Sequence, residues 1–428
     1  MTAEPRQPLA AQARTLARAG DWQGAQQKLT QLISEVTGGT ASDVAINRDQ
    51  YSLNSLNGHV TLDGSRRLFF KYHHEESEEH TIEEYYRAEL LREHGFAVDV
   101  PCYACGEPGR QILLYTLRND RRLADVCREI EAGDDPALQA AVITAQQHAD
   151  RDILQKTLPT LQRGSVDEVV AEPIHQLFWH RLISPDAPAG LGGRVQRFYV
   201  DKEFILAGET LSWQTLSQLQ WEINGVRYAH SLRQLFLEAG QLLAPAALAQ
   251  HGVVVAHGDA HNANVWYDTQ GEQPRLVSFD PAFAGSHIPA LLAEVKATFH
   301  NIFAHPLWLY EPAQADGRYQ ATVVRRGDTL HVSHNWQLTP LRAAFLDSKG
   351  ENYWRPLLAT LREKGWLPGN WQRVVRLAMF CCPTLVLDLR AGGGSGHTPL
   401  TSSLGLALAV MLGSEGDDDF NRWINQLV

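Results

Sequence analysis

The spacing of hydrophobic residues in the first part of the chain is that of helices. Residues 8–36 repeat alanine and leucine at helical intervals, and Gly20-Asp21 interrupts the pattern near its middle. We therefore predict a helical hairpin in this segment. A single helical hairpin cannot bury its own apolar face, so we expect it to pack on the residues that follow.

From about residue 50 the hydrophobic residues are spaced as in β-strands. Segments 51–62 and 66–73 are strand candidates, and the Asp-Gly pair between them is a strong hairpin signal. Residues 78–95 have an acidic start and a glycine stop, which predicts a helix. Further short strands are expected within 98–117. This order predicts a small antiparallel sheet accompanied by one helix.

Helical patterns dominate after residue 120. The exceptions are a run of valines at 253–255, two short apolar segments on either side of a turn at 268–274, and a hairpin-like segment at 321–334. We expect a large, mainly helical second part that carries a few strands.

Composition narrows the class of protein. Of the 428 residues, 44% are hydrophobic and 20% are charged, and 38 lysines and arginines against 49 aspartates and glutamates give a net charge of −11. The chain has no basic block, so we expect neither nucleic acid nor a membrane as a partner. The N-terminus lacks a signal pattern and the five cysteines read as reduced thiols, which predicts a cytoplasmic protein. The oligomeric state does not follow from these features.

The densest polar stretch comes directly after the run of valines. His257, Asp259 and His261 alternate there, followed by Asn262 and Asn264. Two histidines and an aspartate could bind zinc, but the sequence upstream offers no second ligand cluster to complete a metallo-hydrolase centre. A polar turn after a buried strand is the plain alternative.

The residues downstream of this stretch favour a different chemistry. If the two apolar segments around 268–274 pair as antiparallel strands, Asn264 at the start of one lies beside Asp280 at the end of the other. The loop that holds Asp259 ends at the same edge. Two oxygen ligands next to a carboxylate that can act as a base suit Mg²⁺ ions that bridge nucleotide phosphates.

These residues match a known pattern. His257-Gly258-Asp259, then Asn264, and Asp280 after a short hairpin resemble the catalytic and metal-binding loops of the aminoglycoside phosphotransferase and choline kinase superfamily. Protein kinases have His-Arg-Asp and Asp-Phe-Gly at the equivalent places, whereas this chain has His-Gly-Asp and Asp-Pro-Ala. The sequence also lacks a GxGxxG phosphate loop, which speaks against a protein kinase.

The resemblance implies an α+β, bilobal protein-kinase-like fold. Its parts would be an N-terminal helical extension in residues 1–45, a small N-lobe with an antiparallel sheet in 46–117, and a larger, mainly helical C-lobe in 118–428. The C-lobe would carry the catalytic loop, the metal site and the helices that bind the substrate.

The resemblance also implies a role for individual residues. Asp259 would accept a hydrogen bond from the substrate hydroxyl, and Asn264 and Asp280 would hold Mg²⁺. Lys71, in the strand at 66–73, would bind the α- and β-phosphates of ATP. His257 is expected to be a structural hydrogen-bonding residue of the loop.

The resemblance also implies two further parts of the nucleotide site. The glutamate partner of Lys71 is left open, because family spacing favours Glu84, whereas the helical wheel places Glu89 on the apolar face, where a carboxylate needs a cationic partner. Adenine is expected to hydrogen-bond to the backbone near Tyr115 to Leu117.

Together these features predict an ATP-dependent phosphotransferase that acts on a hydroxyl of a small molecule. Sugars, amino sugars, aminoglycoside-like compounds and amino alcohols all fit, and the sequence does not choose between ATP and GTP. The alternatives are a kinase-fold pseudoenzyme that binds a nucleotide for regulation, a nucleotidyl (AMP) transferase on the same fold and, third, a metal-dependent hydrolase.

Overall fold

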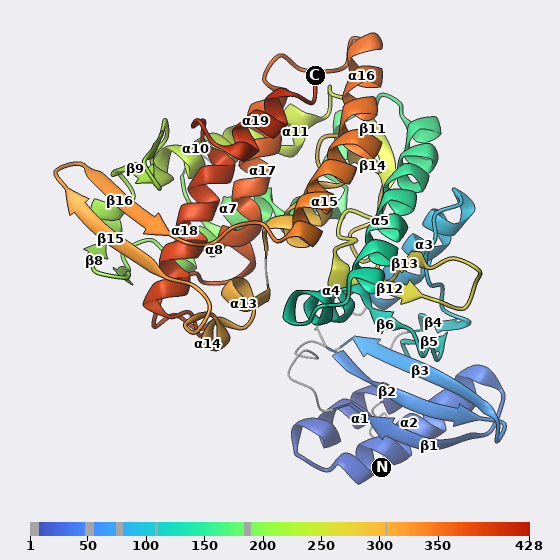
Figure 1. Cartoon of the computed structure of the whole chain (residues 1–428). Coiled ribbons are helices and arrows are strands. Elements are labelled where there is room, and N and C mark those ends of the chain that lie inside the picture. Colours follow the sequence, from blue (N-terminus) through green and yellow to red (C-terminus); the bar gives the residue numbers. More distant parts are fainter. Residues whose placement is uncertain (1–7, 48–54, 74–79, 108–109, 184–189, 305) are drawn as a thin grey trace. The chain divides into compact units, whose positions relative to one another are not determined.

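The chain folds into two compact units, each of which is described by itself. The computed structural model describes residues 8–47, 55–73, 80–107, 110–183, 190–304 and 306–428. Unit 1 consists of Met1–Asp120 and Val277–Ala282, and unit 2 of Arg121–Leu276 and Phe283–Val428. The chain is a mixed α and β protein in which most strand pairs are antiparallel (Figure 1).

Unit 1 is a five-stranded antiparallel sheet with three helices. The sheet order is β1-β2-β3-β5-β4. The predicted helical hairpin, the Asp-Gly hairpin and the helix that follows are all confirmed. Its elements are α1 (Leu9–Arg18), α2 (Trp22–Thr37), β1 (Ala41–Ile46), β2 (Ser55–Leu62), β3 (Arg66–His73), α3 (His80–Glu93), β4 (Tyr103–Cys105) and β5 (Ile112–Thr116).

The N-terminal helices share a core with one face of this sheet. Ala13 of α1 and Leu29 of α2 are fully buried in the same cluster as Leu68 and Phe70 of β3. Because side chains alternate along a strand, Lys71 points to the other face of the sheet. The expectation that the helical hairpin packs on the next segment is therefore met, and the packing leaves the Lys71 face to other contacts.

Strand β1 was not predicted from the sequence. The pairing of β1 with β2 shifts register between Ser42 and Ala45, and Asp43 in this interval has a positive φ of 51°. The period of two that identifies a strand is therefore interrupted. At its end Gly58 of β2 pairs with Ile46, and a Cβ on Gly58 would lie 1.9 Å from the Ala45 carbonyl oxygen. A glycine is required there because the two backbones approach so closely.

Unit 2 contains most of the helices. In chain order the α-helices are α4 (Leu123–Ala132), α5 (Pro136–Thr157), α6 (Val166–Val170), α7 (Trp179–Leu182), α8 (Gly193–Phe198), α9 (Trp213–Leu216), α10 (Leu232–Leu242), α11 (Pro245–Leu248), α12 (Val295–Thr298), α13 (Pro306–Leu309), α14 (Pro312–Ala315), α15 (Pro340–Lys349), α16 (Arg355–Glu363), α17 (Trp371–Val386), α18 (Pro399–Gly413) and α19 (Asp419–Asn425). The short 3₁₀ and π segments are η1 (Leu158–Thr160), η2 (Pro173–Leu177), η3 (Asn262–Asn264), η4 (Phe299–Phe303) and η5 (Gly350–Trp354).

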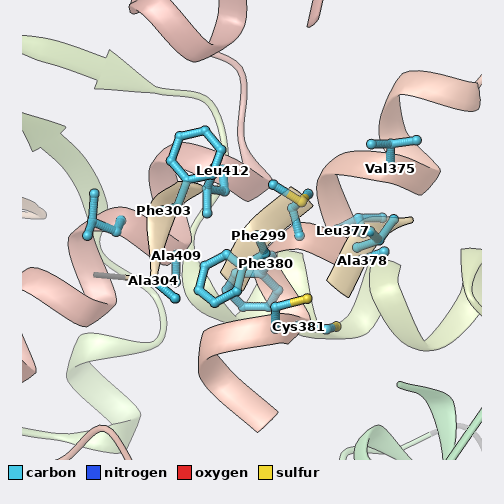
Figure 2. Close-up of a cluster of buried hydrophobic side chains, with 14 of the residues drawn as sticks. Phe299, Phe303, Ala304, Val375, Leu377, Ala378, Phe380, Cys381, Ala409 and Leu412 are labelled. Atoms are coloured by element: carbon cyan, nitrogen blue, oxygen red, sulfur yellow. The ribbon is translucent and has the colours of Figure 1, made fainter. Parts of the chain in front are cut away.

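The core of unit 2 lies where α17, α18 and η4 meet. Figure 2 shows Phe299 and Phe303 of η4 with Phe380 of α17 and Leu412 of α18, all buried. Figure 1 shows α17 and α18 side by side. Helix α18 is apolar all round, as expected of a helix buried on every side. Among the described residues, no helix is long and apolar enough to cross a membrane.

Unit 2 also holds more strands than the sequence pattern predicted. The hairpin at 321–334 is confirmed, but it joins two unpredicted strands in a sheet of order β10-β9-β16-β15, in which β9 and β16 run parallel. Strand β13 crosses the boundary between the units. The strands are β6 (Arg121–Arg122), β7 (Glu203–Ile205), β8 (Thr210–Ser212), β9 (Gln220–Ile223), β10 (Val226–Tyr228), β11 (Val253–Ala256), β12 (Val265–Asp268), β13 (Arg275–Ser278), β14 (Gly285–Pro289), β15 (Ala321–Arg326) and β16 (Thr329–His334).

Candidate active site

The polar loop 257–264 begins at the end of β11. This strand is buried at all four positions and pairs with β14, as expected of a valine-rich core strand. Gly258 then reverses the chain with φ 77°, and a Cβ there would lie 2.8 Å from Ile174 Cδ1 and 2.9 Å from the Phe283 carbonyl oxygen. Only glycine fits this turn, which delivers Asp259 to the end of the strand.

Internal hydrogen bonds hold the loop in one conformation. The Asp259 N–H donates to Nδ1 of His257 at 3.3 Å, and the His261 N–H donates to the Asp259 carbonyl oxygen at 2.8 Å. Asn264 Nδ2 donates to the same carbonyl at 3.1 Å. The Asn262 N–H donates to Asn301 Oδ1 at 2.7 Å. His257 is thus a structural hydrogen-bonding residue, as expected, and Asn262 ties the loop to η4.

The Asp259 side chain stands out from this network. Its Oδ1 is buried and has no hydrogen-bond partner among the described residues. Two cationic or titratable groups lie near that atom, Lys296 Nζ and His261 Nε2, each 4.0 Å away. A buried carboxylate oxygen without a hydrogen-bond partner lowers the stability of a folded protein. A ligand that donates a hydrogen bond to it would remove this cost.

Lys296 and its neighbours were not identified from the sequence. Lys296 is 4% exposed, and its ammonium group donates to His300 Nε2 at 2.8 Å. His300 Nδ1 lies 2.8 Å from the hydroxyl of Tyr310. Burial and the nearby Lys296 hold the pKa of His300 well below its usual range, so its imidazole is neutral.

Arg181 of α7 is the fourth member of this group. No hydrogen bond or ion pair of its side chain is found within the part of the chain that the structure describes. Burial and the charge of Arg194 lower the pKa of Arg181 to about 10, and the charge of Asp259 acts in the opposite direction. The negative charge of Asp259 thus favours the charged form of Arg181.

Lys71 and Asp280 meet within unit 1. Lys71 Nζ donates to Asp280 Oδ1 at 2.8 Å, and their side chains are 14% and 39% exposed. The segment of Asp280 is held to unit 1 by Ser278, whose N–H donates to the Ala97 carbonyl at 2.9 Å and whose carbonyl accepts from Asp99 N–H at 2.8 Å. Two of the predicted site residues are thus in direct contact, although they are far apart in the sequence.

The structure leaves the glutamate partner of Lys71 as a prediction. The side chain of Glu84 lies outside the described residues. The carboxylate of Glu89 accepts a hydrogen bond from Arg92, one turn further along α3.

The predicted adenine site falls at the end of β5. Tyr115 is 7% exposed and pairs with Phe69 of β3. The Leu117 N–H donates to the Arg67 carbonyl at 3.2 Å. An adenine ring bound at this edge of the sheet would have to hydrogen-bond to backbone groups other than the Leu117 N–H.

The predicted magnesium ligands can be tested against their own chemistry. Asn264 precedes β12 in unit 2, and Asp280 follows β13 in unit 1, so each is described within its own unit. The bond from Asn264 Nδ2 to the loop backbone fixes the amide, so that Oδ1 is the atom left to bind a cation. Among the described residues no three His, Cys, Asp or Glu side chains gather as in an all-protein metal centre. An amide oxygen and a carboxylate fit Mg²⁺, which keeps several waters and phosphate oxygens among its ligands.

Comparisons with known proteins return likenesses in structure only. No family model matches the chain, and no curated protein matches its sequence. A macrolide 2'-phosphotransferase type I is 13% identical, with a TM-score of 0.40, and the alignment covers 91% of this chain and 97% of that one. A spectinomycin phosphotransferase, solved with ADP and spectinomycin, is 11% identical, with a TM-score of 0.39 and coverage of 90% and 97%. A microcompartment-associated aminopropanol kinase is 14% identical, with a TM-score of 0.40 and coverage of 87% and 90%.

These solved structures are small-molecule phosphotransferases and kinases, the kind of enzyme that the His-Gly-Asp motif resembles. Because the identities and TM-scores are low, the function of this chain is inferred from its own residues.

Proposed function

We propose that the chain is an ATP-dependent phosphotransferase that transfers the γ-phosphate to a hydroxyl group of a small molecule. The observation that carries the proposal is the state of Asp259 Oδ1. The backbone on either side of it is hydrogen-bonded within the loop, while this oxygen is buried without a partner among the described residues. This oxygen would accept a hydrogen bond from a substrate hydroxyl.

Asp259 would act on the acceptor. Its carboxylate would orient the hydroxyl oxygen for in-line attack on the γ-phosphorus and take up the proton as the new O–P bond forms. The bond from the γ-phosphorus to the β,γ-bridging oxygen breaks, and ADP leaves. The rigid loop supports this role, because the Asp259 backbone is bonded on both its N–H and its carbonyl group.

The remaining predicted residues would act on the nucleotide. Lys71 would neutralise phosphate charge, and its hydrogen bond to Asp280, the carboxylate that would bind the metal, supports this role. Asn264 Oδ1 and the Asp280 carboxylate would hold Mg²⁺. When bound, Mg²⁺ supplies charge neutralisation at the β- and γ-phosphates.

The test is product formation from a library of hydroxyl-bearing metabolites. The purified chain is incubated with Mg-ATP, and mass spectrometry should reveal a phosphorylated product with stoichiometric ADP. Asp259→Asn should lower the rate by at least about a hundredfold, since it removes the base and keeps the shape. Unchanged turnover in that variant would contradict the role of Asp259.

Two controls separate this function from its rivals. Asp152→Asn, in an exposed pair with Lys156 on α5, should leave the rate unchanged. ATP labelled in the α- or the γ-phosphate distinguishes nucleotidyl transfer from phosphoryl transfer. Nucleotide binding without turnover on any acceptor would favour the pseudoenzyme.

A further inference from the structure

One residue of the polar loop is tied to the rest of unit 2 by two hydrogen bonds. Asn262 is 5% exposed and lies between Asp259 and Asn264. Its N–H donates to the side-chain oxygen Oδ1 of Asn301 at 2.7 Å, and its side-chain amide donates to Cys127 Sγ at 3.6 Å. Sulfur is a weak acceptor, so the bond to Asn301 is the stronger one. Asn301 therefore fixes the loop backbone between the proposed base and the predicted metal ligand.

Asn301 is held in turn by a buried ion pair. Its carbonyl oxygen accepts a hydrogen bond from Arg342 Nη1 at 2.7 Å. Arg342 is 3% exposed, and its Nε and Nη2 donate to the two carboxylate oxygens of Glu131, on α4, at 2.8 and 3.0 Å. Such a bidentate pair has a defined geometry. A buried ion pair adds little net stability compared with apolar side chains of similar size, but this one specifies where Asn301 lies.

Asn301 belongs to η4, a π segment that continues α12. The Ala304 N–H donates to the carbonyl oxygen of Phe299, five residues earlier, at 3.0 Å. Phe299 and Phe303 anchor the segment in the core of unit 2 (Figure 2). A π turn is rare and occurs in proteins mostly at functional sites. The anchored π segment thus keeps the Asn301 amide directed at the loop.

The same part of the chain also faces the Asp259 carboxylate. Lys296 of α12 is 4% exposed, and its Nζ lies 4.0 Å from Asp259 Oδ1. Its ammonium group donates to Nε2 of His300, the residue before Asn301, at 2.8 Å. This helical segment therefore lies next to the loop at two points, the side chain of Asp259 and the backbone of Asn262.

We infer that Asn301 is a positioning residue of the proposed reaction, whose amide oxygen holds the loop so that Asp259 and Asn264 keep their places. This inference rests on the proposed function and adds to it a residue that acts only through the Asn262 N–H. Phosphoryl transfer depends on the alignment of the attacking oxygen with the γ-phosphorus, so a small displacement of the loop lowers the rate.

Three variants of the full chain test this role. Asn301→Ala removes the hydrogen-bond acceptor, whereas Asn301→Asp keeps an oxygen at the same place. Asn335→Ala is the matched control, because Asn335 Oδ1 accepts a hydrogen bond from the Gln320 N–H at 2.7 Å. This second bond is exposed and lies at the ends of β15 and β16.

The first measurement is hydrogen–deuterium exchange of peptides that cover the loop, which requires no substrate. In the unmodified chain the Asn262 amide should exchange at least about tenfold more slowly than an unprotected amide. This result does not depend on the folding of any variant. Asn301→Ala should speed exchange in the loop by at least about tenfold. Asn301→Asp and Asn335→Ala should leave it unchanged.

The second measurement is ADP release from Mg-ATP, with water as the acceptor and with each compound of the metabolite library. Asn301→Ala should lower kcat by at least about tenfold and leave KM for ATP unchanged. Asn301→Asp should recover most of the lost kcat. A merely structural residue would change the unfolding temperature without this division between kcat and KM.

The outcomes separate the two proposals. Loop exchange that depends on Asn301, without ADP release by the unmodified chain, supports the anchoring of the loop and contradicts phosphotransfer. Turnover that Asn301→Ala leaves unchanged overturns the inference and supports phosphotransfer. An Asn262 amide that exchanges as fast as an unprotected one, or an equal loss of kcat in Asn301→Ala and Asn301→Asp, also overturns the inference.

Discussion

Unit 2 buries two lysines in opposite ways. Lys349 is 2% exposed and lies between two carboxylates, Asp150 and Glu294, to which its ammonium group donates. Lys296 is 4% exposed, but its hydrogen-bond partner is the neutral His300, and the nearest carboxylate oxygen is 4.0 Å away. The first arrangement satisfies a buried cation and the second leaves it incomplete. Lys349 is therefore a structural residue, and we expect Lys296 to serve the proposed reaction.

This contrast predicts different costs for the same substitution. Lys349→Met should lower the free energy of unfolding by about 3–5 kcal/mol, because two buried carboxylates lose their counter-ion. Lys296→Met should cost less than about 1 kcal/mol and still lower turnover. Urea denaturation of both variants measures the difference. Equal destabilisation would mean that Lys296 is structural as well.

A single histidine predicts a pH dependence of stability. His175 is fully buried, its Nε2 donates to the Val169 carbonyl at 2.8 Å, and burial lowers its pKa from 6.5 to about 4. The unfolded chain therefore binds this proton at higher pH than the folded one. The contribution of His175 is complete above pH 6.5 and is lost as the pH falls toward 4, by about 1.4 kcal/mol per unit.

Urea denaturation between pH 7 and pH 5 measures this loss. His175→Gln keeps an Nε2 donor for Val169 and cannot titrate, so the variant should lose less stability over that range. A pH slope equal to that of the unmodified chain would show that other groups dominate its acid unfolding.

At the scale of elements, close backbone approach decides where β1 pairs. A Cβ on Gly58 would overlap the Ala45 carbonyl, so Gly58→Ala should separate β1 from β2 and destabilise unit 1 by about 2 kcal/mol or more. Gly64, in the turn between β2 and β3, has φ 71°, and a Cβ added to it would meet no atom of the described residues within 4 Å. Gly64→Asn should be tolerated, because asparagine adopts this conformation readily. Circular dichroism during thermal unfolding compares the two variants.

The predictability of each element follows from the strength of its local pattern. In the helical hairpin and in the β2–β3 hairpin the hydrophobic residues recur at regular intervals, and a glycine-containing turn interrupts them. Both hairpins were predicted. Strand β1 has a register shift, and β7 to β10 are three or four residues long, too short for a period to be visible. Strands β7 and β8, and likewise β9 and β10, pair across short turns, whereas the parallel pairing of β9 with β16 joins segments that are remote in the chain.

The same reasoning applies to the candidate site. The loop with Asp259 and Asn264 is local in sequence, so its motif could be recognised through its resemblance to a known family. Lys296 and His300 stand four residues apart, which places them on one helix face, but nothing local shows that this face meets Asp259. Arg181 comes from a four-residue helix with no motif. Residues brought together only by tertiary packing could not be found from the sequence.

At the scale of the whole molecule, the two units have separate hydrophobic cores. One cluster holds α1, α2 and the five-stranded sheet, and the other holds the helices of unit 2. No buried residue is common to the two clusters among the described residues. Each unit therefore has the means to unfold cooperatively by itself.

Calorimetry should accordingly show two unfolding transitions. Gly58→Ala should lower the temperature of one of them and Lys349→Met that of the other, since each change affects a single core. A single transition that shifts in both variants would show that the units unfold together.

The backbone of Asp280 has a consequence for the residue type that stands there. Its φ of 56° is a left-handed conformation that glycine adopts without strain and most other residues avoid. Replacement by glycine would relieve this backbone strain but would remove the carboxylate that accepts the hydrogen bond from Lys71. Under the proposed function, the carboxylate is the reason that aspartate occupies a position where glycine would be less strained.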